Sequence, residues 1–445
     1  MKNKTFILYL LFSFGLFAFP IQRDTLENGL IILSYEDHKL PILEIRVVIK
    51  AGSVFDPEGK EGLANLTLKG LFRGTKNYPG LKIYEELEKV GARIGEGTGY
   101  DYAQISLSLL KKDLNLALDI LSDCLFNPLF PDAEIEKLKS EIIAGILRDE
   151  GEPDYLLSRE FYQNLFFNTP YAHPVVGKRE SIERIKREEI LDFYQRYYIP
   201  NNIFLVVVGD FFREELIQQI NERFGKIPKG EIKEFSFPKI NQLSGRKIKI
   251  IKKPEINQSY IMLGHLGIRE GDKDMIPVRV MNFILGGGAL TSRLGKEIRE
   301  KRGLAYDVGS YFDRRFYAGA FVCEMQTEIN NTQKAIEIIL GEIKKMKEEG
   351  AKLEELKRAK KFYTGNFPLT FDSYAEKANL LSSIQFHQLG DDYLEKFPER
   401  IEGLTLEVIN EMAKKYLDPD NLLLVIVGNI EEKDLALEGW EMIQE

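Results

Sequence analysis

Two stretches of the chain carry the same pattern of apolar and polar positions, 219 residues apart. Ser181 to Asp210 matches Arg400 to Asn429 without a gap. In both, apolar residues recur at helical spacing, a turn with proline and asparagine follows, and a run of leucine and β-branched residues ends in glycine. This pattern predicts an amphipathic helix, a turn and a buried strand. A unit repeated at a fixed offset indicates a duplicated architecture.

The rest of each half shows the same order of elements more loosely. Strands are expected at 43–51 and 259–266, and charged amphipathic helices at 133–147 and 353–362. Because the strands are unevenly spaced among pairs of helices, the pattern favours an α+β fold over a regular doubly wound sheet. We predict two homologous α/β-roll halves, each a mostly antiparallel sheet packed with helices, which together form a clam-like shell. The expected segments are an N-terminal half at 20–230, a linker rich in proline, glycine and charge at 231–245, and a C-terminal half at 246–445.

The first residues have the pattern of a targeting signal. Lys2 and Lys4 supply positive charge, and Thr5 to Phe19 contains no charged residue. About 15 such residues suit a secretory signal and fall short of the ~20 that span a bilayer as a helix. We therefore assign residues 1–19 to a signal peptide and expect export to the periplasm, with an uncleaved membrane anchor as the alternative. No later stretch is long and apolar enough to predict a membrane span in the mature chain.

Composition narrows the range of partners. The 445 residues include 61 Lys+Arg and 69 Asp+Glu, which gives a formal charge of −8. Since no basic stripe is present, nucleic acid is not expected as a partner. The two cysteines, Cys124 and Cys323, exclude a disulfide framework and are either two isolated buried thiols or one bridge.

The histidines do not form a helical metal motif. His38, His173, His265 and His387 include no pair four or five positions apart, so no helix can present two imidazoles to one metal ion. A zinc site would need distant segments and additional carboxylates. There is no G-x-S-x-G nucleophile elbow. The glycine run at 286–288 resembles a phosphate-binding loop only superficially.

One segment resembles the metal-binding helix of the pitrilysin/insulinase family of peptidases, the inverted zincins. Asp56 to Thr75, DPEGKEGLANLTLKGLFRGT, matches the stretch in which the family has His-x-x-Glu-His, two zinc ligands and the base that activates water. Those positions hold Asn65, Leu68 and Lys69 here. The family's carboxylate ligand, on a helix further along the chain, corresponds to Leu138. The resemblance therefore implies that this chain binds no metal and no other cofactor.

A second segment resembles the part of the family that assists catalysis. Leu285 to Ser310, LGGGALTSRLGKEIREKRGLAYDVGS, matches a family segment with an arginine and a tyrosine seven positions apart, here Arg299 and Tyr306. In the family this pair donates hydrogen bonds to the substrate carbonyl and to the oxyanion that develops on it. The local pattern predicts a charged amphipathic helix over 292–302, a cap at Gly303, and a strand that begins at Tyr306. On local chemistry alone, Arg299 would be one more solvated charge.

The loss of the zinc residues together with the Arg/Tyr pair resembles the non-zinc subunit of the family's two-chain, processing-protease-like peptidases. The resemblance implies a zinc-bearing homologous subunit as the partner, with zinc bound by that partner. It also implies a chamber that admits short or unfolded peptides, each paired with a sheet edge as an added strand. Gly286, Gly287 and Gly288 would form a flexible wall of that chamber, and a helix-ending turn is the alternative for these glycines.

Two functions follow from these observations. The first is an exported zinc-free subunit of a heteromeric metallopeptidase, in which Arg299 and Tyr306 assist at the zinc of a partner chain. The second is a non-catalytic structural or peptide-binding member of the same fold. We favour the first because a scaffold has no use for that pair at that spacing.

Overall fold

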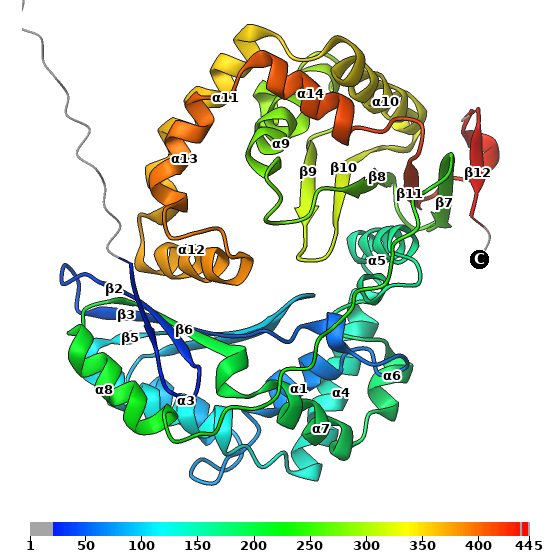
Figure 1. The fold of residues 1–445 in the computed structure, drawn as a ribbon. Helices are drawn as coiled ribbons and strands as arrows, with labels where there is room; N and C mark the ends of the chain where they lie inside the picture. The colour runs from blue at the N-terminus through cyan, green and yellow to red at the C-terminus, as the bar shows by residue number, and fades with distance from the viewer. Residues whose placement is uncertain (1–20, 437, 444–445) are drawn as a thin grey trace, which may run out of the picture.

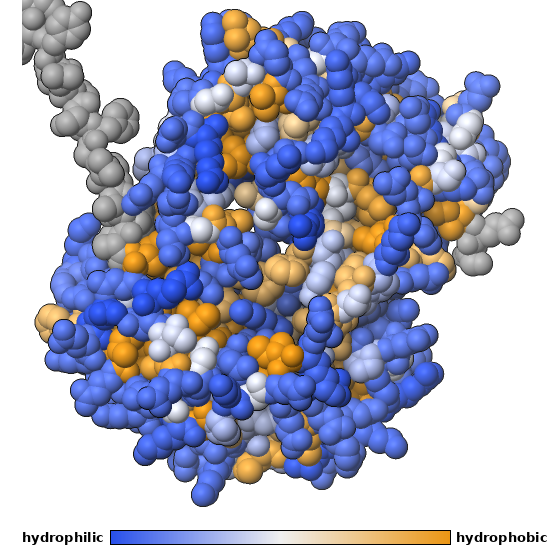
Figure 2. Space-filling view, viewed as in Figure 1, coloured by the Kyte–Doolittle hydropathy of each residue, from blue (hydrophilic) through white to orange (hydrophobic). Residues whose placement is uncertain are grey.

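Two six-stranded sheets, one from each half of the chain, form the framework of the computed structural model (Figure 1). The structure describes residues 21–436 and 438–443, so the predicted signal peptide, residues 1–19, lies outside the described residues. Most helices cover the outer sides of the two sheets. Figure 2 shows a hollow between the two halves. The predicted α+β class with two like halves is confirmed.

The N-terminal sheet has the strand order β1-β2-β6-β3-β5-β4. β2 and β6 pair in parallel, and the other neighbours are antiparallel. β6 is buried along its whole length, which explains its unbroken apolar sequence. The strands are β1 (Gln22–Thr25), β2 (Ile31–Glu36), β3 (Ile42–Ile49), β4 (Arg93–Thr98), β5 (Ala103–Leu110) and β6 (Ile203–Gly209). The helices are α1 (Leu63–Gly70), α2 (Lys82–Lys89), α3 (Leu114–Phe126), α4 (Asp132–Asp149), α5 (Pro153–Leu165), α6 (Arg179–Arg184), α7 (Arg187–Tyr197) and α8 (Arg213–Phe224).

The C-terminal sheet has the strand order β12-β7-β11-β8-β10-β9. β12, β7 and β11 run parallel to one another, and the remaining pairs are antiparallel. The strands are β7 (Arg246–Lys252), β8 (Gln258–Gly267), β9 (Val308–Arg314), β10 (Gly319–Glu328), β11 (Leu423–Gly428) and β12 (Trp440–Met442). The helices are α9 (Met275–Asn282), α10 (Thr332–Glu349), α11 (Leu353–Asn366), α12 (Tyr374–His387), α13 (Tyr393–Glu402) and α14 (Leu406–Tyr416).

The sequence repeat is a structural repeat. α7 and α14 have 11 residues each and begin 219 positions apart, and each leads into the third strand of its sheet, β6 or β11. Each half has its own core, which contains Cys124 in the first and Cys323 in the second. Both thiols are free, so the expectation of two isolated buried cysteines is confirmed. None of the helices in the described residues has the length and apolar character needed to cross a membrane.

Two helices cross between the halves. α5 belongs to the N-terminal half in sequence but packs on β8 and β11 of the other sheet, and α12 of the C-terminal half packs on β3 and β6. Phe161 of α5 shares a core with Val425 of β11, and Leu381 of α12 shares one with Val206 of β6. Because each half contributes a helix to the other, the two halves are joined by apolar cores as well as by the linker.

The turn between β9 and β10 places a buried cation in the seam between the halves. Arg315 is only 4 % exposed, and its guanidinium pairs with Asp313 at 2.9 Å. The amide of Phe316 donates to Asp101 Oδ2 at 2.9 Å, which ties this turn to the N-terminal half. Four aromatic rings of the N-terminal half surround the guanidinium carbon, with centroid distances of 3.7 Å to Tyr100, 4.5 Å to Tyr162, 4.8 Å to Phe166 and 5.0 Å to Tyr171.

The linker between α8 and β7 contains no helix or strand, yet it packs along the same seam. Phe235 lies 4.8 Å from Phe55, measured between ring centroids. Phe237 stacks on Tyr317, with centroids 5.0 Å apart and planes 11° from parallel. These contacts hold the linker against both halves.

Candidate functional site

The motif positions of the N-terminal half offer a metal ion no adequate set of ligands. Asn65 and Leu68 lie on α1 and are buried, and Leu138 on α4 packs in the same core as Leu68. Leucine has no lone pair to offer at the positions of the family's base and carboxylate ligand. The side-chain nitrogen of Asn65 is buried and has no hydrogen-bond partner among the described residues, and an amide is a poor zinc ligand. The residues present do not fit zinc.

Lys69, the third of the motif positions on α1, carries a positive charge. Its Nζ lies 3.8 Å from Glu96 Oε1, on the edge strand β4. The hydroxyl of Tyr84 donates to the same oxygen at 3.4 Å, and burial together with the Glu96 charge raises the pKa of Tyr84. Arg73, just after α1, donates to both carboxylate oxygens of Glu141 at 3.2 and 2.5 Å. These hydrogen bonds lower the pKa of Glu141.

Two cations and two carboxylates therefore balance each other around α1. Sequence reasoning missed Glu96 and Glu141, because they come from β4 and α4, far from α1 in the chain. Across residues 21–436 and 438–443, no group of three or more His, Cys, Asp or Glu side chains could hold a metal ion.

Arg299 and Tyr306 come together in the C-terminal half. The guanidinium carbon of Arg299 lies 4.6 Å from the ring centroid of Tyr306. Tyr306 is 84 % exposed, and its hydroxyl makes no hydrogen bond to the described residues. Arg299 has no ion pair in this part of the chain, whereas nearby Lys301 and Arg302 both pair with Glu297. The side-chain polar groups of both residues therefore have no hydrogen-bond or ion-pair partner within the described residues.

The backbone around this pair differs in two respects from the expectation, in the form of the helix and in the start of the strand. The helix that carries Arg299 has a π-helical turn at Gly295–Glu300. Gly303 caps this helix: its φ is 59°, and its backbone N–H donates a hydrogen bond to the carbonyl of Arg299 at 3.1 Å. The cap prediction is confirmed. The predicted strand start at Tyr306 is wrong, because the strand β9 begins at Val308. The chain first buries Leu304 and Ala305, which leaves Tyr306 outside the strand ladder and directed to solvent.

The three glycines form a helix-ending turn. Gly286 and Gly287 complete a π-helical turn, Phe283–Gly287, that continues α9, and Gly288 follows it. A β carbon on Gly286 would lie 2.3 Å from Ser310 Oγ, so close packing against β9 requires this glycine. Gly287 is exposed, and a role of these residues in substrate binding stays a prediction.

Each candidate segment lies beside an edge strand, because α1 packs on β4 and Tyr306 is followed by β9. β4, which carries Glu96, ends the N-terminal sheet, and β9, which follows Tyr306, ends the C-terminal sheet. An edge strand has unpaired backbone N–H and C=O groups with which an extended peptide can form hydrogen bonds.

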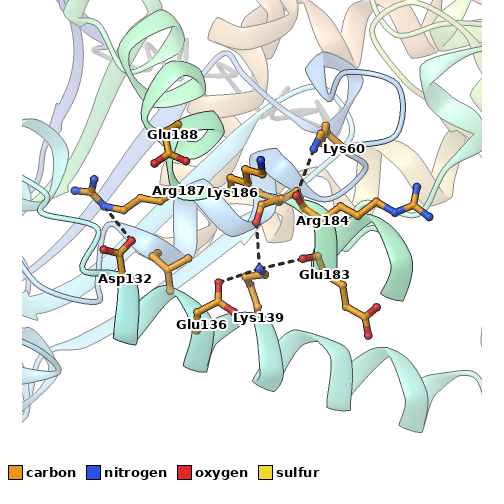
Figure 3. A pocket seen from close by; sticks show the side chains of 11 residues that line it. Lys60, Asp132, Glu136, Lys139, Glu183, Arg184, Lys186, Arg187 and Glu188 are labelled. Carbon is orange, nitrogen blue, oxygen red and sulfur yellow. Dashed lines mark hydrogen bonds and ion pairs between the residues drawn. The ribbon is translucent and has the colours of Figure 1, made fainter.

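A charged depression lies between α4 and the α6–α7 turn, with Lys60 of the Asp56–Thr75 segment in its lining and a volume of about 590 Å³ (Figure 3). Lys139 points into it and donates to Glu136 Oε1 at 2.9 Å and to the carbonyls of Glu183 and Ile185 at 3.2 and 3.1 Å. Its ammonium has three N–H groups, and these three acceptors occupy all of them. The depression is therefore a structural junction of three helices.

Comparisons with known proteins identify one family. Residues 31–179 match the model described as insulinase (peptidase family M16), and residues 184–363 match that of the peptidase M16 inactive domain. A protein of Helicobacter pylori named non-peptidase homolog YmxG is 28% identical over 432 residues, 96% of this chain and 99% of that protein. A protein of Rickettsia bellii named uncharacterized zinc protease is 28% identical over 410 residues, 92% of each chain.

Solved structures agree. A peptidase M16 inactive domain from Pseudomonas fluorescens has a TM-score of 0.86 and 28% identity, and the match covers 92% of this chain and 98% of that one. A protease from Helicobacter pylori has the same fold, with a TM-score of 0.85, 20% identity, and coverage of 92% and 99%. The chain belongs to peptidase family M16.

Proposed function

We propose that this chain is the exported, zinc-free subunit of a two-chain M16 metallopeptidase. It binds short or unfolded peptides and presents Arg299 and Tyr306 to a substrate that lies at zinc on a homologous partner subunit. The observation that carries the proposal is the state of this pair: the two side chains touch, are accessible, and lack other partners within the described residues.

The geometry suits stabilisation of a developing oxyanion. Stacking on the Tyr306 ring orients the flat guanidinium of Arg299 while leaving its N–H groups available. The phenol and the guanidinium then donate hydrogen bonds to the peptide carbonyl as negative charge builds on its oxygen. Tyr306 stands two residues before the edge strand β9, so a peptide paired with that edge passes beside the pair.

The need for a partner follows from the N-terminal half. Its motif positions carry Asn65, Leu68, Lys69 and Leu138, so this chain supplies neither the metal nor the base that peptide hydrolysis by this family requires. The charged start and the uncharged run at 5–19 support export.

A non-catalytic structural or peptide-binding role is the second candidate. The Lys69–Glu96 and Arg73–Glu141 ion pairs favour it, because each cation at the motif helix α1 is neutralised by a carboxylate of this same chain. In that case the edges β4 and β9 bind peptides or a partner chain, and Arg299 and Tyr306 have no effect on any turnover.

Substitutions in the assembled complex separate the two candidates. In a complex with the zinc-bearing homologue from the same organism, Arg299→Ala and Tyr306→Phe should lower turnover of a quenched fluorescent peptide by roughly 10²–10³. Size-exclusion chromatography should show unchanged assembly. Arg302→Ala, an exposed arginine three positions away, serves as the matched control and should retain turnover. Unchanged turnover in both test variants would remove the pair from the mechanism and favour the second candidate.

A further inference from the structure

An exposed surface of the C-terminal half combines apolar and basic side chains. It is formed by α11 and the 3-10 turn Phe367–Phe371 that follows. Leu353, Phe362 and Leu369 are 53 %, 45 % and 61 % exposed, high values for large apolar side chains. Figure 2 shows apolar patches among hydrophilic surface on this side of the C-terminal half. We call this surface, residues 353–369, the α11 face.

The charge of the α11 face contrasts with that of the whole chain. Four cations occur within five residues: Lys357, Arg358, Lys360 and Lys361. Lys357 pairs with Glu354 at 3.0 Å, and Lys360 donates to the uncharged carbonyl of Glu402. Arg358 and Lys361 have no carboxylate partner in the described part of the chain. Glu354 and Glu355 lie in the same range, so four cations and two carboxylates give residues 353–369 a formal charge of +2. In a chain with a formal charge of −8, this local positive excess favours an anionic partner.

The described fold begins on the same group of helices. Arg23 donates to Gln385 of α12 at 2.5 Å and pairs with Asp391, which precedes α13, at 2.9 Å. Ile21, the first described residue, packs in cores that include residues of α12 and α13. It follows closely after the uncharged run Thr5 to Phe19.

α13 connects this entry point to the α11 face. α13 packs on α11, and Phe397 of α13 stacks on Phe367 with ring centroids 4.9 Å apart. Figure 1 shows β1 beginning beside α12, with α13 and α11 continuing from there along one side of the molecule. The first described residues and the basic, apolar surface therefore belong to one side of the fold.

We propose that the α11 face rests on an anionic lipid surface, next to the point where the N-terminal segment joins the fold. Lys360, Lys361 and Arg358 approach the lipid phosphates, and Phe362 and Leu369 enter the interface between headgroups and acyl chains. Apolar side chains at the interface and basic side chains beside the phosphates together hold such a peripheral contact. The contact is peripheral and does not depend on the proposed role of Arg299 and Tyr306.

Vesicle flotation tests this contact. Residues 20–445 contain every described helix and strand, so this form of the chain keeps the whole fold without the uncharged run. It should float with vesicles of phosphatidylglycerol and phosphatidylethanolamine at low salt, and should remain unbound with phosphatidylcholine alone. Removing one lysine near such a surface weakens binding by roughly fivefold, so Lys360→Gln with Lys361→Gln should weaken it on the order of tenfold to thirtyfold.

Matched variants make the result specific. Lys334→Gln with Lys414→Gln removes two exposed lysines from α10 and α14 and should leave flotation unchanged. Leu369→Ser, at a site with little packing to lose, should weaken binding without a change in thermal unfolding. The proposal is overturned if residues 20–445 do not bind anionic vesicles, or if both lysine pairs matter equally. It is also overturned if the Lys360/Lys361 variant changes the sedimentation of the protein without vesicles, because the face would then join copies of the chain.

Discussion

Replacement of Arg315 by methionine should loosen the seam between the two halves. The substitution keeps an unbranched apolar side chain but removes a guanidinium that four aromatic rings and Asp313 surround. Since the turn at Arg315 belongs to the C-terminal half and the rings belong to the N-terminal half, the loss falls on the contact between halves and spares each separate core.

The size of the loss follows from burial. A desolvated cation on aromatic rings contributes about 2 kcal/mol, and removing one member of a buried ion pair costs about 3–5 kcal/mol. The side chain of Asp313 is 28% exposed, so its carboxylate regains water once Arg315 is gone. We therefore expect the lower end of that range, about 3 kcal/mol of unfolding free energy.

Urea unfolding followed by two signals measures the effect. Trp440 is the single tryptophan and lies on β12, so its fluorescence reports the C-terminal half, whereas far-ultraviolet circular dichroism reports both halves. In the unaltered chain the shared cores should make the two transitions coincide. In the Arg315→Met variant the midpoints should fall and separate.

The neighbouring arginine provides the control. Arg314 pairs with Glu270 at 2.9 Å and is partly exposed, so Arg314→Met should cost about 1 kcal/mol or less and keep the transitions together. Two outcomes would refute a stabilising role of the Arg315 guanidinium at the seam. One is an equal loss of stability in Arg314→Met and Arg315→Met, and the other is an Arg315→Met chain as stable as the original.

Two further predictions concern the N-terminal half. Asn65→His with Lys69→His places two imidazoles four positions apart on α1 and releases Glu96 from its lysine, so the double variant should retain zinc through dialysis while the unaltered chain retains none, as measured by elemental analysis. The hydrogen bond of His38 with Asp210, and then that with Glu36, raises the pKa of His38 above 6.5. Because the folded pKa is the higher one, this contribution to stability is complete below pH 6.5 and is lost as pH rises through the folded pKa. The stability difference between the unaltered chain and His38→Gln, followed by urea unfolding, should therefore shrink above pH 6.5; a difference independent of pH would contradict it.

Repetition in the sequence predicted much of the fold. The helix–turn–strand units at 181–210 and 400–429 became α7 with β6 and α14 with β11, because a gap-free pattern fixes which face of each element is buried. The expected strand at 259–266 and helix at 133–147 correspond to β8 and α4 within about two residues.

The contacts between the halves could not be read from the sequence. From the local sequence, Arg315 would be a solvated turn residue. It is a buried cation because four aromatic rings from distant parts of the chain pack around it. The exchange of α5 and α12 depends on tertiary packing that local periodicity does not encode. Phe235 and Phe237 looked like part of a plain linker, although both rings pack in the seam.

The candidate site was predicted in part. The resemblance to a known family singled out Asn65, Leu68, Lys69 and Leu138 and the Arg299–Tyr306 pair. The contact between Arg299 and Tyr306 was not predicted and comes from the structure, and the role of the pair stays a prediction. The two carboxylates that neutralise Lys69 and Arg73 come from β4 and α4, and nothing in the local pattern around α1 indicates them.

The most direct test of the central claim is the zinc content and peptidase activity of residues 20–445, first alone and then mixed with a zinc-bearing M16 homologue from the same organism. A split enzyme predicts no zinc and no turnover for this chain alone, and turnover above that of the homologue by itself on mixing. Stoichiometric zinc with activity in the chain alone, or no gain on mixing, would contradict it.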